Sequence, residues 1–386
     1  MPIVFVHGNG DDAAKWMGIQ WLFESNGYPR ERLYALRLTH PAARNNDAVA
    51  MENRSSTTDQ AAELAAAVTR ALIESGAEKV ALVGSSRGGN TIRNFLKFGG
   101  GKAVVSHAIL CGTPNHGVFR MDANKGNEFN GLGDFLQKMN FGGEVVEGVR
   151  FLTIRSDRFD KYAQPVGAGF ESPALEGAKN VVLPGMDHRE VAFRPEAFRE
   201  MYEFLTGKPP AKLTVEQEEE VTLAGLVTGW AAGAATNLPE PGVKLEVREY
   251  SSGTVLWAGL PGEKGWGPLK VKGGTLLEFR LEREGRRIRY LKSAFLRSFA
   301  QVNLRWTPEG KAGSVVVVRP QGYWSKGRDE LKRDGELVAE VPPGLPTLDR
   351  FVLPVKEAGW LELRGERVPV APAEEDEVVV AEFLWE

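Results

Sequence analysis

The fold of the N-terminal half is decided by the stretch Lys79-Val80-Ala81-Leu82-Val83-Gly84-Ser85-Ser86-Arg87-Gly88-Gly89-Asn90. Its apolar run is typical of a strand buried in a parallel sheet, and the spacing of residues 91–98 predicts a helix. Between them, Gly84-Ser85-Ser86-Arg87-Gly88 matches the pattern G-x-S-x-G. Such an elbow holds its serine in a strained conformation that exposes the hydroxyl, so both ends must be small. Ser86 is therefore the candidate nucleophile; the alternative is a glycine-rich turn that serves packing or binds a phosphate.

Apolar runs alternate with helical segments throughout the first 205 residues. Strands are expected at 2–6, 33–38, 79–83, 103–111, 149–154 and 180–183, and helices at 13–24, 58–74, 91–98 and 195–205. This alternation predicts an α/β fold in which helices cover both faces of a mostly parallel sheet.

Residues 113–150 interrupt this alternation. A short amphipathic segment at 129–139 places Phe129, Leu132 and Phe135 on one side. An apolar-faced helix at this position is either a movable lid over an apolar substrate or a fixed flank that is always packed, and the pattern does not distinguish them.

The composition of the chain changes after Thr206-Gly207-Lys208-Pro209-Pro210, which resembles a linker. Short alternating runs between glycine and proline then predict a β-sandwich or barrel region, as one module or two in series. We therefore expect a catalytic α/β domain over 1–208 with a lid-like insertion at about 113–148, a linker at 209–213 and a β region at 214–386.

Composition excludes several classes of function. With 42% hydrophobic and 26% charged residues and a net charge of -3, the chain is typical of a globular protein without a nucleic-acid-binding surface. One cysteine excludes an internal disulfide. No stretch approaches about 20 apolar residues, so we expect no transmembrane segment. Met1 precedes the first expected strand directly, which favours a cytoplasmic protein, or a secreted one whose leader was removed.

A nucleophilic serine requires a histidine to accept its proton and an acid to orient that histidine. In elbow-containing hydrolases these residues follow the chain order serine, acid, histidine. Among five histidines, His188 lies on the loop after the last expected strand and is the candidate base. Asp157 directly follows the strand 151–155 and is the candidate acid, with Asp160 in reserve. The alternative for Asp157 is a plain salt bridge with a neighbouring arginine.

The remaining candidates surround these three residues. The backbone N–H of Arg87, at the helix N-terminus, and that of Asn9, in the first turn, are the expected oxyanion donors. The expected substrate contacts are His116, Phe129, Leu132 and Phe135. This chemistry requires no metal and no organic cofactor.

Four motifs together resemble the bacterial and archaeal lipases of the α/β-hydrolase fold: Val6-His7-Gly8-Asn9-Gly10-Asp11, Gly84-Ser85-Ser86-Arg87-Gly88-Gly89-Asn90, Gly112-Thr113-Pro114-Asn115-His116-Gly117 and Arg155-Ser156-Asp157. The appended β region makes the chain similar to the archaeal lipase of Archaeoglobus and its relatives. The resemblance implies hydrolysis of carboxylic esters by Ser86, Asp157 and His188, with a small-molecule or lipid ester as partner and transient contact with a lipid surface. Arg87 stands where a smaller or aromatic residue is common, and the insertion is short; both features argue against long-chain triglycerides.

Two other functions fit the same pattern. A polyester depolymerase would use the same triad in an open site. A non-catalytic surface- or lipid-binding protein would depend on the β region, where Trp230, Trp257, Trp266 and Trp324 either contact an aggregated substrate or pack in the core. The intact set of catalytic candidates favours an enzyme.

Overall fold

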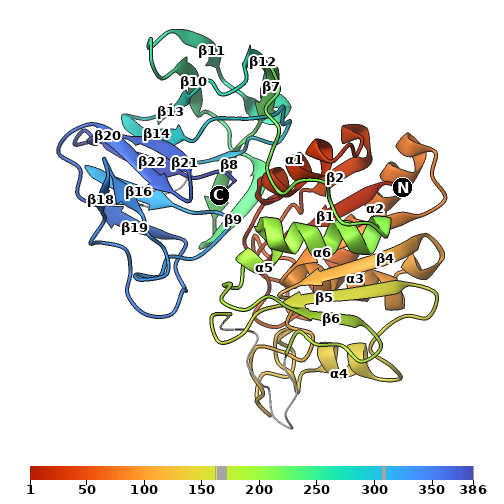
Figure 1. Cartoon of the computed structure of the whole chain (residues 1–386). Coiled ribbons are helices and arrows are strands. Elements are labelled where there is room, and N and C mark those ends of the chain that lie inside the picture. The colour runs from red at the N-terminus through yellow and green to blue at the C-terminus, as the bar shows by residue number, and fades with distance from the viewer. Residues whose placement is uncertain (161, 163–171, 307–309, 386) are drawn as a thin grey trace. The chain divides into compact units, whose positions relative to one another are not determined.

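The computed structural model describes residues 1–160, 162, 172–306 and 310–385. The chain forms two compact units (Figure 1). The first contains Met1–Thr214 together with Ala231–Asn237, and the second contains Val215–Trp230 and Leu238–Glu386. Each unit has its own hydrophobic core.

The first unit is built on a six-stranded parallel sheet with the order β2-β1-β3-β4-β5-β6. Its strands are β1 (Ile3–Val6), β2 (Leu33–Leu36), β3 (Val80–Ser85), β4 (Val105–Cys111), β5 (Arg150–Arg155) and β6 (Lys179–Val182). Every residue of β1 and β3 is buried, because helices cover both faces of the sheet. The α/β-hydrolase core predicted from the sequence is confirmed.

Four longer helices form the outer layers of this unit (Figure 1). α1 (Met17–Ser25) packs with α6 (Pro195–Thr206) on one face, and α2 (Thr57–Ser75) packs with α3 (Arg87–Phe98) on the other. Shorter helical pieces are η1 (Ala13–Trp16), η2 (Arg30–Arg32), η3 (Gly101–Ala103), α4 (Asp134–Asn140) and α5 (Glu190–Phe193). Of the helices in the described ranges, none is long and apolar enough to cross a lipid bilayer.

The helix of the insertion is shorter than the sequence predicts. α4 covers Asp134–Asn140, whereas Phe129 and Leu132 lie in the turns that precede it. The Asn130 side chain organises these turns: its oxygen accepts from the N–H groups of Met121 and Leu132, and its amide donates to the carbonyl of Met121. A hydrophobic pattern does not register such a polar centre, so it overestimates the helix.

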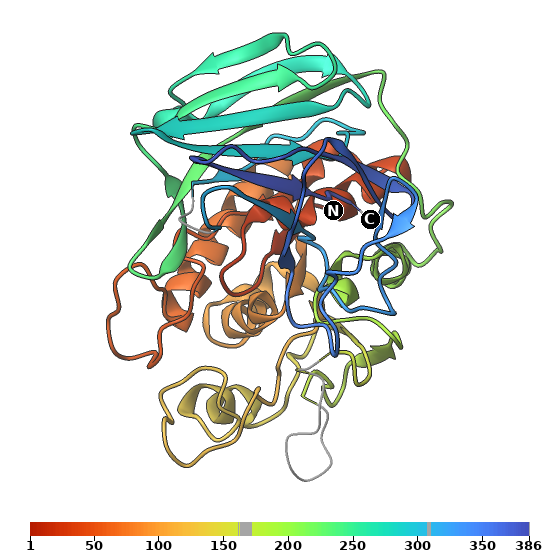
Figure 2. The same ribbon diagram turned by 90° about the vertical axis from the view of Figure 1, so that its left-hand side faces the viewer.

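The second unit is β-rich, as predicted, and its longer strands lie in stacked layers (Figure 2). The sheet orders are β11-β10-β13-β14-β22-β16-β19, β12-β7, β15-β8-β9 and β18-β17-β20-β21. The strands are β7 (Glu220–Gly225), β8 (Val227–Ala231), β9 (Ala234–Pro239), β10 (Lys244–Glu249), β11 (Val255–Gly259), β12 (Trp266–Lys272), β13 (Leu277–Arg283), β14 (Arg286–Lys292), β15 (Leu304–Arg305), β16 (Ser314–Val318), β17 (Lys332–Arg333), β18 (Glu336–Leu337), β19 (Arg350–Leu353), β20 (Gly359–Leu363), β21 (Glu366–Val370) and β22 (Glu377–Glu382). A short 3-10 turn, η4 (Gly262–Lys264), lies between β11 and β12.

The tryptophans of the β region divide by exposure. Trp266 and Trp324 are buried, and each indole N–H donates to a backbone carbonyl, of Val302 and Asp349 respectively. Trp257 is half-buried, while Trp230 is 37% exposed. Core packing therefore accounts for Trp266 and Trp324.

Candidate active site

Ser86 occupies the sharp turn between β3 and α3. Its backbone has φ 52° and ψ -121°, a conformation that non-glycine residues rarely adopt. A Cβ atom on Gly84 would lie 2.7 Å from the backbone of Gly88 and Gly89, and one on Gly88 would collide with the carbonyls of Val6 and His7. The two glycines of the motif are therefore required by close contacts between backbones.

His188 connects the serine to a carboxylate. Its Nε2 lies 2.9 Å from Ser86 Oγ, and its Nδ1 lies 3.0 Å from Asp160 Oδ1. His188 is 5% exposed and Asp160 is fully buried. Because an ionised carboxylate only accepts, the Nδ1 nitrogen carries the proton, and Nε2 is left to accept from the Ser86 hydroxyl.

The carboxylate beside His188 belongs to Asp160, whereas the sequence favoured Asp157. Asp157 instead accepts from the backbone N–H groups of Phe159 and Gly185. The backbone turns between the two aspartates, with Asp160 N–H donating to the Asp157 carbonyl at 3.1 Å. This turn carries the chain back toward His188, so the second aspartate reaches the ring. The structure thus brings the reserve candidate, Asp160, rather than Asp157 to the His188 ring.

Several groups hold the His188 ring in place. The Tyr162 ring meets it edge-on, with centroids 4.4 Å apart and planes at 77°. Gly112 has φ +56°, and a Cβ atom there would lie 3.2 Å from His188 Nδ1. On the histidine loop, Asp187 accepts from the N–H groups of Arg189 and Glu190, while Glu190 accepts from Asp187 N–H. These reciprocal bonds begin the short helix α5, which the sequence pattern missed.

The turn after β1 lies against the serine. A Cβ atom on Gly8 would lie 3.3 Å from Ser86 Cβ. His7 orders this turn, since Leu38 N–H donates to its Nε2 and its Nδ1 therefore carries the proton that faces the Gly8 carbonyl. The Asn9 side chain accepts from Ala43 N–H at 2.8 Å. The turn that contains Asn9 therefore packs against Ser86 through Gly8. The roles of Asn9 and Arg87 as oxyanion donors stay predictions.

Asp11 joins this turn to the histidine loop. Its Oδ1 lies 3.4 Å from Lys15 Nζ and 3.2 Å from Arg189 Nη2. Burial alone would raise the pKa of Asp11, but the charges of Lys15 and Arg189 outweigh burial and lower that pKa to about 2. The charge pattern of the sequence contains no signal for this junction.

The insertion residues proposed as substrate contacts are half-buried. His116 Nε2 lies 2.6 Å from Glu144 Oε1, and its Nδ1 lies 3.1 Å from the Ser172 carbonyl. These partners give His116 a place in the packing of the insertion. Its role in substrate binding, and that of Phe129, Leu132 and Phe135, stays a prediction.

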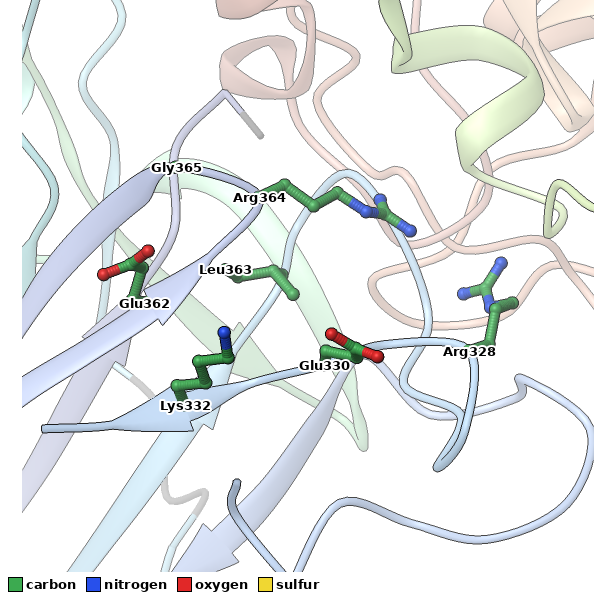
Figure 3. A pocket seen from close by; sticks show the side chains of 7 residues that line it. All are labelled: Arg328, Glu330, Lys332, Glu362, Leu363, Arg364 and Gly365. Atoms are coloured by element: carbon green, nitrogen blue, oxygen red, sulfur yellow. The ribbon is translucent and has the colours of Figure 1, made fainter. Parts of the chain in front are cut away.

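A separate hollow lies in the second unit, with a volume of about 350 Å³. Figure 3 shows its lining: Arg328, Glu330, Lys332, Glu362, Leu363, Arg364 and Gly365. Lys332 and Glu362 are cross-strand partners on β17 and β20. Acidic and basic groups alternate there, and none of the seven is a serine, cysteine or histidine. No group of three or more histidine, cysteine or acidic side chains suited to a metal occurs within the described part of the chain.

The family model described as lipase (class 2) matches residues 1–196. The chain is similar to Aspergillus fumigatus lipase B, with TM-score 0.43 and 19% identity over 55% of this chain and 54% of that one. It is also similar to the mature Bacillus licheniformis lipase BlEst2 (TM-score 0.35, 21% identity, 48% and 84% covered). A third similar structure is Bacillus subtilis carboxylesterase CesB, with TM-score 0.31 and 14% identity over 54% of this chain and 84% of that one. The chain thus spans about half the length of the Aspergillus enzyme, and no curated protein matches it.

Proposed function

Because the chain belongs to the class 2 lipase family, we propose that it hydrolyses carboxylic esters with Ser86 as nucleophile, His188 as base and Asp160 as the orienting acid. The observation that carries this proposal is the position of His188, whose two ring nitrogens face Ser86 Oγ at 2.9 Å and Asp160 Oδ1 at 3.0 Å. A serine hydroxyl is a weak nucleophile at neutral pH, and a histidine within hydrogen-bond reach that is itself oriented by a carboxylate activates it.

The reaction follows from this geometry. Ser86 Oγ attacks the ester carbonyl carbon while His188 Nε2 takes the hydroxyl proton, and the Asp160 carboxylate stabilises the imidazolium. The oxyanion faces the backbone N–H groups of Arg87 and Asn9, where the N-terminus of α3 favours negative charge. His188 then gives its proton to the leaving alcohol, and water activated by the same imidazole releases the acid from Ser86.

We propose esters with short acyl chains as the substrate class. The side chain after the nucleophile is a buried arginine, and the insertion is anchored to α3 by the Arg93 and Lys97 side chains. Lys97 Nζ donates to the carbonyls of Met139, Phe141 and Gly143, at and just after the C-terminal end of α4. An anchored flank suits a soluble ester better than a lid that opens at a lipid surface. The likeness to the Archaeoglobus lipase remains a prediction.

The proposal is tested with p-nitrophenyl esters of graded acyl length, with wild type and Ser86→Ala measured side by side. We expect kcat to fall by about a thousandfold or more in the variant, because the nucleophile is removed while binding is kept. A polyester film in the same panel tests the depolymerase alternative. Wild-type rates in Ser86→Ala would contradict the proposal.

A further inference from the structure

One buried side chain connects the two segments expected to supply the oxyanion donors. Arg87 carries one donor on its own backbone, and its side chain is 1% exposed. Its Nη1 donates to the Pro41 carbonyl at 3.1 Å, and the same carbonyl accepts from Gly10 N–H at 3.1 Å. Gly10 directly follows Asn9, the residue expected to carry the second donor. A single carbonyl therefore lies between the guanidinium and the turn after β1.

A second contact holds the segment that bears Pro41. Arg87 Nη1 donates to Ser55 Oγ at 2.9 Å, and Nη2 donates to the Ser55 carbonyl at 2.8 Å. Ser55 N–H donates in turn to the Ala42 carbonyl at 2.9 Å. The neighbouring Ala43 N–H donates to Asn9 Oδ1 at 2.8 Å. The chain at 41–43 is thus fixed between Arg87 and Asn9.

The charge of Arg87 is balanced by Glu128, from the insertion. Arg87 Nε lies 2.8 and 2.9 Å from the two carboxylate oxygens, and Nη2 lies 2.5 Å from Oε1. Burial raises the pKa of Glu128, while the Arg87 charge opposes this rise. With these contacts all five N–H donors of the guanidinium have acceptors. A lysine has three donors around a single point and does not reproduce this fork.

We propose that the Arg87 guanidinium, balanced by Glu128, is a positioning group that sets the spacing between the two oxyanion donors. This inference rests on the proposed esterase function. The guanidinium touches neither substrate nor reacting atoms; it acts through the Pro41 carbonyl and the Asn9–Gly10 turn. An arginine suits the position after the nucleophile because its planar guanidinium binds the Pro41 carbonyl and Ser55 at the same time.

A simpler role would be to anchor the insertion, and Arg93 provides the matched comparison. Arg93 lies on the same helix, is 2% exposed and also binds the insertion. Its Nη1 faces Asn115 Oδ1 at 3.3 Å, and its Nη2 donates to Asn140 Oδ1 at 2.7 Å and to the Glu144 carbonyl at 3.0 Å. Arg93 therefore shares burial and anchoring with Arg87, and its contacts are with the insertion rather than with the 41–55 segment.

The test compares each variant on an ester and on the corresponding thionoester, whose sulfur is a poor acceptor in an oxyanion hole. In Arg87→Met we expect kcat on the ester to fall about 30- to 100-fold with KM changed less than about threefold, and the preference for oxygen over sulfur to shrink. Glu128→Gln, which keeps the shape but not the charge, is expected to lose about tenfold in kcat. Arg93→Met is expected to keep the oxygen preference at a lower Tm. Arg87→Lys is expected to have nearly the same low kcat and reduced oxygen preference as Arg87→Met, because lysine cannot form the same set of hydrogen bonds.

A second readout requires no turnover. Amide hydrogen exchange of Gly10 is expected to accelerate at least about tenfold in Arg87→Met and to stay unchanged in Arg93→Met. An unchanged Gly10 amide, or an equal loss of oxygen preference in Arg93→Met, would overturn the inference while leaving the esterase proposal intact. Equal activity of wild type and Ser86→Ala would instead remove the esterase proposal.

Discussion

At the scale of single residues, two aspartates three positions apart take different parts. Asp157 uses its carboxylate within the chain, to accept from Phe159 and Gly185. Asp160 is fully buried and turned to His188. Asp160 N–H and Tyr162 N–H, bonded to the Asp157 carbonyl and to Asp160 Oδ1, hold the loop in this shape. The turn therefore decides which of the two aspartates faces His188.

Replacing each aspartate in turn by asparagine distinguishes the roles of Asp157 and Asp160. Asp160→Asn is expected to lower kcat by about a thousandfold or more, because an amide donor facing Nδ1 favours the wrong tautomer of His188. Asp157→Asn is expected to lower kcat less than about tenfold: the amide keeps only one of the two acceptor oxygens that bind Phe159 and Gly185, but the group accepting from the His188 ring, Asp160, is unchanged. Steady-state kinetics on p-nitrophenyl butyrate measures both. A larger loss in Asp157→Asn would return the role of the acid to that residue.

At the scale of elements, the elbow depends on α3 lying very close to the end of β1. A Cβ atom on Gly88 would lie 2.7 Å from the His7 carbonyl oxygen and would collide with Val6. The N-terminus of α3 therefore packs directly against the backbone at the end of β1, with no room for a side chain between them. The insertion is fixed to the same helix through Glu128, Asn140 and Glu144, which favours the fixed flank over the movable lid.

Gly88→Ala therefore tests how tightly these elements are packed. We expect a loss of about 2–3 kcal/mol in the free energy of unfolding, because the backbone of β1 must shift to admit a methyl group. Gly142→Ala is the matched control: Gly142 has φ +73° with nothing within 4 Å, so only backbone strain of about 1 kcal/mol is expected. Urea denaturation measures both. Equal losses would show that close contact is not what requires Gly88.

At the scale of the whole molecule, Asp11 is where segments distant in sequence meet. Its carboxylate faces Lys15 and Arg189. Its carbonyl accepts from Asn237 Nδ2 at 3.0 Å, and the same amide donates to Leu38 at 2.9 Å. Asn237 belongs to 231–237, a segment from the second half of the sequence that is part of the first unit. The first unit is therefore completed by residues far beyond the expected linker.

The low pKa of Asp11 predicts a pH-dependent contribution to stability. The folded pKa of about 2 lies below the usual 3.8, so the contribution is present above the unfolded pKa and is lost as the pH falls toward 2. Relative to Asp11→Asn, wild type is expected to be more stable by about 2 kcal/mol at pH 7. Urea unfolding across pH 7 to 2 measures this difference. A gap that stays constant with pH would contradict the assignment.

Local patterns were enough for the parallel sheet and the elbow, and they singled out Ser86 and His188, which the structure brings within 2.9 Å of each other. Periodicity, glycine spacing and chain order are properties of the sequence itself, so they can be identified without the folded structure. The tertiary structure alone decided that Asp160 rather than Asp157 faces the ring, that Arg87 binds Glu128 and Ser55, and that residues 231–237 complete the first unit. The physical reason is that these outcomes depend on the path of turns and on hydrogen bonds between residues tens to hundreds of positions apart, whose partners a linear pattern does not specify.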